Sequence, residues 1–171
     1  MTQSCVSTSR AAIRRSVQRV GALLASSAQA SSASLALHPE PVRQHGAYAL
    51  IGGPSGQVLL VRADTGRCYL PGGRIEPGED APTALAREIE EECGWSAAVE
   101  TRLGKACQRI MDGSVELSAT YWRARLSEPL GHAGEHELTW ATPAEALDLL
   151  HRPGDRAIVL GALRNGLESV A

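Results

Sequence analysis

Apolar and polar residues alternate along several short stretches of this chain, and Gly and Pro residues separate these stretches. Alternation with a period of two is the pattern of a strand that buries one face. We therefore predict strands at residues 46–51, 57–62, 67–70, 97–109, 114–126 and 137–140. The glycine-rich residues 52–56 predict a hairpin turn between the first two strands, and Met111–Gly113 predicts another between the two longest.

A helix between Asp80 and Gly94 is the best-defined predicted element. Asp80 is a favourable N-cap, Pro82 lies in the first turn where its missing N–H is harmless, and Gly94 is placed to end the helix. Residues 71–78, before it, are predicted as a Gly/Pro-rich loop, and further helices are predicted at residues 143–150 and 155–167. Because strands and helices mix without strict alternation, we expect an α/β domain with a mixed sheet and helices packed on it.

The first 39 residues have a different composition from the rest of the chain. They contain nine serines, eight alanines and four arginines, and no Asp, Glu, Trp or Tyr, so they cannot supply a core. We expect residues 1–41 to be a flexible extension and residues 42–171 to form the domain. An organellar transit peptide and a secretory or twin-arginine signal are the alternatives, and residues 13–24 have the spacing of a short amphipathic helix.

Composition excludes several classes of protein. With 171 residues, 43% of them hydrophobic and 21% charged, the chain has the makeup of one globular domain and not of a fibrous or wholly disordered protein. No apolar run approaches the roughly 20 residues of a membrane span. Residues 40–171 carry a net charge of −6, which repels nucleic acid, so no nucleic-acid polymer is expected as a partner.

The cysteines indicate a reducing compartment. Four are present, without a C-x-x-C pair, and a disulfide framework is not expected. Cys68, Cys93 and Cys107 are predicted to be small core residues and not nucleophiles. We accordingly expect a cytoplasmic protein.

Acidic residues are concentrated near the end of the predicted helix. Glu88, Glu91 and Glu92 are three and four residues apart and so share one face, where like charges destabilise a helix. A solvated acidic surface is the ordinary meaning of such a run. Apolar positions on the same helix and the Gly-rich loop before it favour a metal site instead. Clustered carboxylates with a loop carbonyl suit a hard cation, Mg²⁺ or Mn²⁺.

The segment Gly73–Trp95 resembles the Nudix box, whose pattern is G-x5-E-x7-R-E-U-x-E-E-x-G-U with U a bulky apolar residue. All seven identity positions are met, by Gly73, Glu79, Arg87, Glu88, Glu91, Glu92 and Gly94. Ile89 fits U, whereas Trp95 is aromatic where an aliphatic residue is commoner. The resemblance extends over about residues 43–166, and it implies the Nudix α/β/α sandwich with a mixed sheet.

The resemblance implies metal-dependent hydrolysis of a nucleoside diphosphate linked to another moiety, by attack of water on the pyrophosphate. It implies Glu88, Glu91 and Glu92 as metal ligands, together with the main-chain carbonyl of Gly72, and Glu88 is the alternative general base. Gly73, Glu79 and Arg87 would support these ligands, with Arg87 and Glu79 paired. Relatives also use a late glutamate as base or ligand; Glu135 is preferred here, with Glu137 and Glu128 as alternatives.

The substrate is less clearly indicated. The absence of a proline between Trp95 and Pro129 and of a tyrosine near residues 110–113 leaves a MutT-like resemblance, which implies oxidised or canonical nucleoside triphosphates. ADP-sugars, dinucleoside polyphosphates and a non-catalytic nucleotide sensor are alternatives, and a homodimer is left open. Candidates for stacking on a base are Tyr48, Tyr69, Trp122 and Trp140, each of which could equally be a core residue.

Basic residues near the box admit two interpretations. Arg67 and Arg74 flank the predicted loop and could hold phosphates, although exposed arginines seldom have so specific a role. His132 and His136 are four residues apart, but the glycines between and before them argue against a helix. We therefore interpret them as loop histidines and not as a zinc site.

Overall fold

The computed structural model describes residues 40–164. Its strands are β1 (Val42–Ile51), β2 (Val58–Arg62), β3 (Cys68–Tyr69), β4 (Gly72–Arg74), β5 (Trp95–Ile110), β6 (Val115–Pro129) and β7 (Glu137–Ala141). Its helices are α2 (Ala81–Cys93), α3 (Pro143–Leu149) and α4 (Pro153–Arg164), with a short 3₁₀ turn η1 (Met111–Gly113). The proposed extension, its amphipathic helix and the predicted end of the last helix lie outside the described residues and stay predictions.

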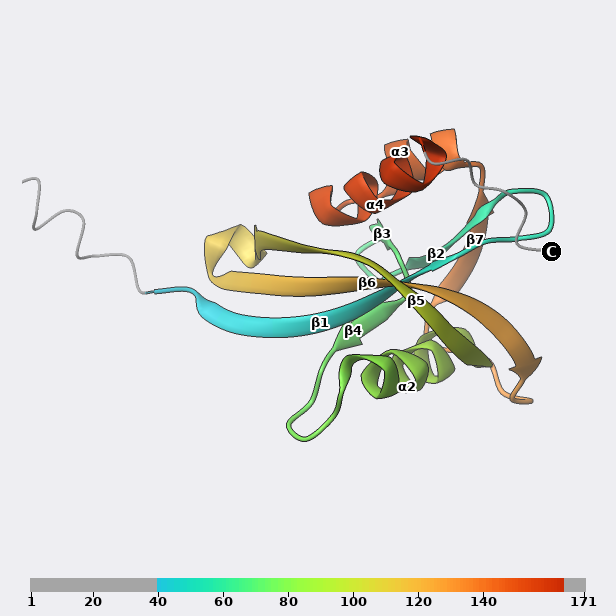
Figure 1. Ribbon diagram of the computed structural model, residues 1–171, viewed down its shortest axis with the longest axis horizontal. Coiled ribbons are helices and arrows are strands. Elements are labelled where there is room, and N and C mark those ends of the chain that lie inside the picture. The colour runs from blue at the N-terminus through green and yellow to red at the C-terminus, as the bar shows by residue number, and fades with distance from the viewer. Residues whose placement is uncertain (1–39, 165–171) are drawn as a thin grey trace, which may run out of the picture. The chain divides into compact units, whose positions relative to one another are not determined.

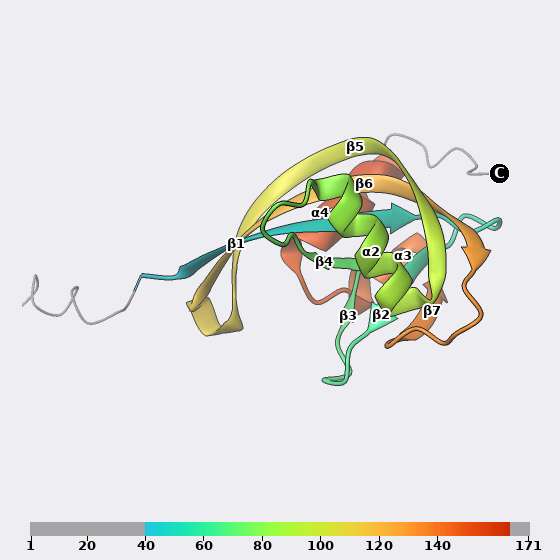
Figure 2. The same cartoon turned by 90° about the horizontal axis from the view of Figure 1, so that it is seen from below.

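The strands form two sheets, ordered β4-β1-β6-β5 and β3-β2-β7 in the described part of the chain. β1 and β6 run parallel, with Tyr48 opposite Tyr121, while the other pairs are antiparallel. Figure 1 shows α3 and α4 on one side of the strands and α2 on the other. In the perpendicular view, α2 lies within the curve of β5 (Figure 2). The prediction of an α/β sandwich with a mixed sheet is confirmed.

Two predictions about strands are wrong. β1 and β2 do not form a two-stranded ribbon, because only Gly52 and Val58 bridge them and the strands then enter different sheets. The turn itself is present, closed by the Gly53 N–H donating to the Gln57 carbonyl at 2.8 Å. The predicted loop at residues 71–78 contains β4, which pairs antiparallel with β1. The local alternation of apolar and polar residues does not indicate which strands pair, because the partners are distant in the sequence.

Helix α2 begins and ends where its residues predict. The carboxylate of Asp80 accepts a hydrogen bond from the Thr83 N–H at 2.8 Å, and Gly94 caps the helix in the left-handed conformation with φ 70°. Leu85 and Ile89 are fully buried against the four-stranded sheet. The helix therefore turns its apolar residues to the core and its carboxylates toward β4 and the loop before β7.

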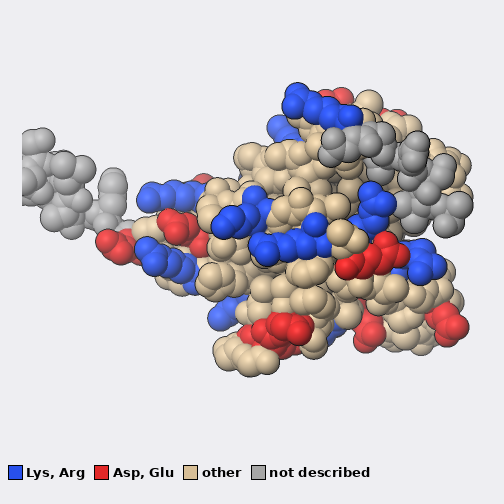
Figure 3. Space-filling model, in the orientation of Figure 1, with Lys and Arg blue, Asp and Glu red and all other residues tan. Residues whose placement is uncertain are grey.

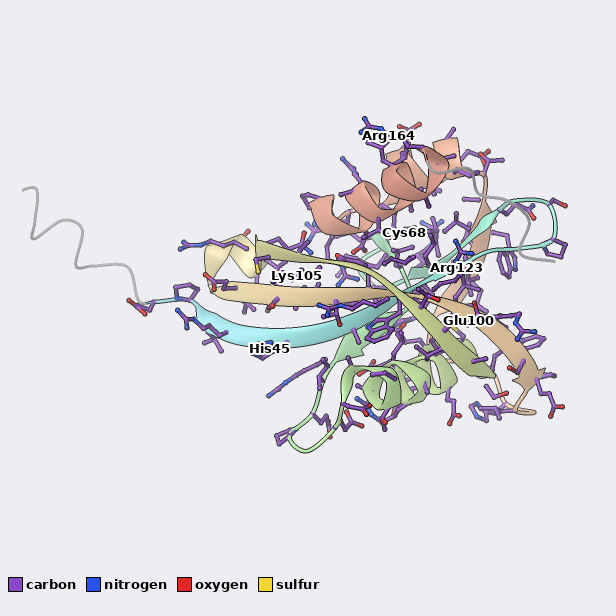
Figure 4. All side chains as sticks on the ribbon, viewed as in Figure 1. His45, Cys68, Glu100, Lys105, Arg123 and Arg164 are labelled. Atoms are coloured by element: carbon purple, nitrogen blue, oxygen red, sulfur yellow. The ribbon has the colours of Figure 1, made fainter. Side chains whose placement is uncertain are left out.

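The burial of the cysteines agrees with the prediction only in part. Cys68 and Cys93 are buried, as predicted, and Figure 4 shows Cys68 between the strands and the layer of α3 and α4. Cys107 was predicted to be a core residue, but it is exposed. It lies in the second half of β5, where exposed and half-buried residues alternate and Cys107 belongs to the exposed face. None of the helices in the described range is long and apolar enough to cross a membrane.

Candidate active site

Strand β4 turns alternate main-chain groups toward α2. The Ala49 N–H donates to the Pro71 carbonyl at 2.8 Å, and the Ile75 N–H donates to the His45 carbonyl at 3.0 Å. In an antiparallel ladder the residues between such pairs direct their N–H and C=O groups away from the partner strand. Gly72 accordingly donates its N–H to Glu92 Oε2 at 2.8 Å.

Two glycines allow this close approach. A Cβ added at Gly72 would lie 2.2 Å from the Ala47 carbonyl oxygen, and Gly72 has a φ of 122° that side chains rarely adopt. A Cβ at Gly73 would lie 2.3 Å from Glu88 Oε2. The space that a side chain would take is filled by the Glu88 carboxylate, so the glycines of the box bring strand and helix acids together.

Arg87 links the acids of the helix to the loop before it. Its Nε and Nη2 donate to the two carboxylate oxygens of Glu79 at 2.9 and 3.0 Å, so the predicted pair is present. Its Nη1 donates to Glu88 Oε1 at 3.0 Å and to Glu91 Oε2 at 3.1 Å, and its Nη2 also donates to the Arg74 carbonyl at 3.1 Å. The hydrogen bond from Arg87 holds the pKa of Glu79 below its usual range. One guanidinium thus holds three carboxylates and β4 in place.

Two of the helix carboxylates, Glu88 and Glu92, are largely buried. Burial, together with the neighbouring charges of Glu88 and Glu135, raises the pKa of Glu92 to about 7 against the opposing hydrogen bond from Gly72. Burial also raises the pKa of Glu88. Within residues 40–164, no three acidic, histidine or cysteine side chains already converge on one point. The donors nevertheless fit a hard divalent ion, because they are all oxygens and their mutual repulsion would be relieved by its charge.

The loop before β7 closes over the end of α2. The Glu135 and His136 N–H groups donate to the carbonyls of Glu91 and Glu92 at 2.9 and 3.2 Å. Gly134 permits this contact, since a Cβ there would lie 2.2 Å from the Glu92 carbonyl oxygen. The structure therefore places the Glu135 backbone on the end of α2, close enough for its charge to raise the pKa of Glu92, while its side chain is exposed. Glu137 points outward, 72% exposed and 3.4 Å from Arg62.

A cavity of about 670 Å³ opens beside Glu92. It extends from Glu92 and His136 past Tyr69 to the tip of the β5–β6 hairpin. Several of its lining residues can carry positive charge: Arg67, Arg109, His136, His151 and Arg152. On the face seen in Figure 3, acidic side chains gather along the lower edge near α2, and basic ones lie over the central strands. Carboxylates beside a basic cavity suit an anionic ligand held through a metal ion.

His136, Arg152 and Asp155 were not identified as site residues from the sequence. His136 was interpreted as an ordinary loop histidine, but its Nε2 lies 3.6 Å from Glu92 Oε1 and its buried Nδ1 has no hydrogen-bond partner among the described residues. Arg152 lines the cavity and pairs with Asp155, which is fully buried. No sequence signal distinguishes them, because Asp155 also has the position and type of an ordinary residue in a first helical turn.

The residues predicted to stack on a base or to hold phosphates lie in different parts of the structure. Tyr69 and Arg67 line the cavity, whereas Arg74 lies in another depression, beside His45. The other aromatic candidates are elsewhere: Tyr48 is buried under Arg152, Trp122 packs against the core on the α2 side, and Trp140 is an exposed residue of β7. Only Tyr69 of the four lies on the wall of this cavity.

Comparisons with known proteins identify the family of the chain. The model of the NUDIX domain matches residues 42–160. A Bacillus subtilis protein named as a provisional 8-oxo-dGTP diphosphatase is 47% identical over 60 residues, 34% of this chain and 40% of its own length. A Mycolicibacterium smegmatis protein named 8-oxo-(d)GTP phosphatase is 34% identical over 92 residues, 53% of this chain. The match covers 28% of that protein, so this chain spans less than half the length of either relative.

A solved structure gives the same result for the whole domain. The solution structure of the E. coli ORF135 protein superimposes with a TM-score of 0.60 at 26% identity, over 77% of this chain and 96% of that one. The family model, moreover, covers well over half of the chain. This chain belongs to the Nudix family.

Proposed function

We propose that this protein is a pyrophosphohydrolase that uses a divalent metal ion, Mg²⁺ in preference to Mn²⁺, to hydrolyse a nucleoside triphosphate, with 8-oxo-dGTP as the first substrate to test. The observation that carries the proposal is that Glu92, which accepts a hydrogen bond from the Gly72 N–H, lines a basic cavity, while Glu88 lies against Gly73 of the same strand. The names of the two curated relatives support the choice of substrate.

The proposal gives each residue of the site a role. Glu88, Glu91 and Glu92 would hold the metal ion with the Gly72 carbonyl, and Arg87 would keep the first two carboxylates oriented. The ion supplies charge neutralisation at the phosphates and lowers the pKa of an attacking water. The Glu135 carboxylate takes a proton from that water, as the water oxygen joins phosphorus and the bridging P–O bond breaks. The products are a nucleoside monophosphate and pyrophosphate.

The direct test is a panel of substrates incubated with Mg²⁺ or Mn²⁺. We expect pyrophosphate release from 8-oxo-dGTP or a canonical nucleoside triphosphate, and slower turnover of ADP-ribose and diadenosine tetraphosphate, because their markers are absent from the sequence. The measurement is product identity by chromatography. No turnover across the panel, together with a rise in melting temperature on adding nucleotide, would favour a nucleotide sensor and sink the enzyme proposal.

Metal binding is expected to depend on pH through Glu92. Its pKa is about 7 in the folded protein, above the ordinary value of 4.5. Folding therefore favours the protonated carboxyl of Glu92. In the metal-free protein this contribution to the free energy of unfolding is fully present below pH about 4.5 and is lost as the pH rises through about 7. A metal ion must displace that proton at pH 6 but not at pH 8. We expect Mg²⁺ to raise the melting temperature more at pH 8 than at pH 6, measured by differential scanning fluorimetry; equal increases would contradict the assignment.

A further inference from the structure

The guanidinium of Arg152 is fixed inside the cavity from several sides. Its Nε donates to Asp155 Oδ2 at 3.1 Å, and its Cζ lies 4.0 Å from the ring centroid of Tyr48 and 4.6 Å from that of Tyr69. The side chain is only 11% exposed. A planar guanidinium held by a carboxylate and two aromatic rings keeps one orientation, so its remaining N–H donors are directed before any ligand arrives.

Asp155 is in turn held by the core. It is fully buried, and it accepts hydrogen bonds from the Leu70 N–H at 3.2 Å and the Tyr121 hydroxyl at 2.9 Å. Both oxygens are therefore occupied before a ligand arrives, Oδ1 by Tyr121 and Oδ2 by Leu70 and Arg152. Asp155 itself is covered, and the group that this pair presents to the cavity is a donor.

The charge of the pair points to a neutral ligand group. Asp155 offsets the positive charge of Arg152, whereas Arg67 and Arg109 are exposed cations on the cavity wall. Attraction for phosphates falls to those exposed arginines and to the metal ion. A guanidinium paired with a carboxylate contributes directional hydrogen bonds with little net charge, and arginine donors match the O6 and N7 acceptors of a guanine edge.

We propose that Arg152 selects the base of the substrate, by donating to the O6 carbonyl of guanine or 8-oxoguanine and rejecting adenine. Guanine presents acceptors at O6 and N7 and 8-oxoguanine keeps the O6 acceptor, although its N7 is protonated, whereas adenine places an amino donor where O6 would be. A donor-only side chain therefore pairs with the first edge and opposes the second. The proposal rests on the nucleotide hydrolase function proposed above, and it makes Arg152 a specificity-determining residue that is outside the Nudix box.

The test compares base preference in the full chain and three variants. Arg152→Lys keeps a charge opposite Asp155 but loses the planar fork. The double variant Arg152→Gln/Asp155→Asn removes both charges. It leaves no buried charge without a partner, so we expect it to fold even if the single change destabilises the protein. Arg109→Gln, at an exposed arginine of the same cavity, is the matched control. Binding of GMP, 8-oxo-GMP and AMP is measured by calorimetry without metal, and kcat/KM for GTP and ATP is measured with it.

We expect the wild type to bind GMP and 8-oxo-GMP more tightly than AMP. The double variant should lose roughly 5- to 150-fold in affinity for the two guanine nucleotides, the range for one good bidentate arginine–guanine contact, and Arg152→Lys should lose less because lysine is still a donor. Affinity for AMP should change less than twofold in Arg152→Lys and should not fall in the double variant, because glutamine can pair with adenine. Arg109→Gln should weaken all three ligands alike. The kcat/KM ratio of GTP to ATP should fall with the same variants.

Two results would overturn the proposal. One is equal wild-type affinity for GMP and AMP; the other is a uniform loss of all three ligands in Arg152→Lys, which would assign Arg152 to the phosphates. Absence of turnover in the wild type is a separate matter, because it would refute the hydrolase function while the metal-free binding ratios still report on Arg152. Retained guanine preference in the double variant would likewise place base selection elsewhere.

Discussion

Replacing Glu92 with glutamine is expected to abolish metal-dependent hydrolysis and leave the fold intact. The amide keeps an oxygen that can accept the 2.8 Å hydrogen bond from the Gly72 N–H. It also removes the cost of ionising a buried carboxylate whose pKa is raised to about 7. A neutral amide, however, is a far weaker ligand for a divalent cation. We expect kcat/KM to fall by at least about 100-fold, because loss of a residue that only supports a metal ligand already costs about 10- to 100-fold.

The matched control is Glu90→Gln, an exposed acid of the same helix. It removes the same charge without touching β4, and its activity should remain within about twofold of wild type. Melting temperature at pH 8 without metal should be unchanged or higher in Glu92→Gln. If that variant keeps wild-type turnover, Glu92 is not a ligand. If it unfolds, its carboxylate is needed for the structure instead.

The second large effect is expected from Asp155→Ala. Asp155 is fully buried and accepts from Leu70, Tyr121 and Arg152. Its removal leaves the Arg152 guanidinium largely buried without a counter-ion, and breaking such a pair on one side typically costs about 3–5 kcal/mol. We expect a loss of that size in the free energy of unfolding, measured by urea denaturation. It would exceed half of the total stability of many single domains.

Two further variants separate the charge from the packing. Asp148→Ala, at an exposed acid of α3, should change stability by less than about 0.5 kcal/mol. Arg152→Met/Asp155→Ala removes both partners and should recover part of the loss, because no buried charge then remains uncompensated. A loss in Asp155→Ala below about 1 kcal/mol would show that water reaches Arg152 and replaces its partner.

Local signals predicted those elements whose ends are set by their own residues. Asp80 and Gly94 bound α2 because an N-cap carboxylate and a left-handed glycine act within one turn. The β5–β6 hairpin was predicted for a similar reason, although both strands extend further than the alternation indicated. The pairing of Glu79 with Arg87 also followed from the box, and the structure adds the bonds from Arg87 to Glu88 and Glu91.

Features that depend on distant pairing escaped the sequence. β4 was predicted as a loop because three residues rich in glycine carry no alternation, and it becomes a strand only through its ladder with β1. Cys107 was placed in the core because its type favours burial, yet one face of β5 is exposed there. No local sequence pattern identified His136, because its position beside Glu92 is fixed by the packing of residues 134–136 on the end of α2.

The sequence by itself determined the family, the α/β class and the helix that carries Glu88, Glu91 and Glu92, because a seven-position box and helix caps are encoded within a few consecutive turns of chain. Only the tertiary structure decided which side chains share a cavity with Glu92. Tyr69, His136 and Arg152 come from three separate segments, and Asp155 is buried through contacts with residues 34 and 85 positions away. Such contacts depend on how the sheets and helices pack, and no short-range pattern of residue types records them.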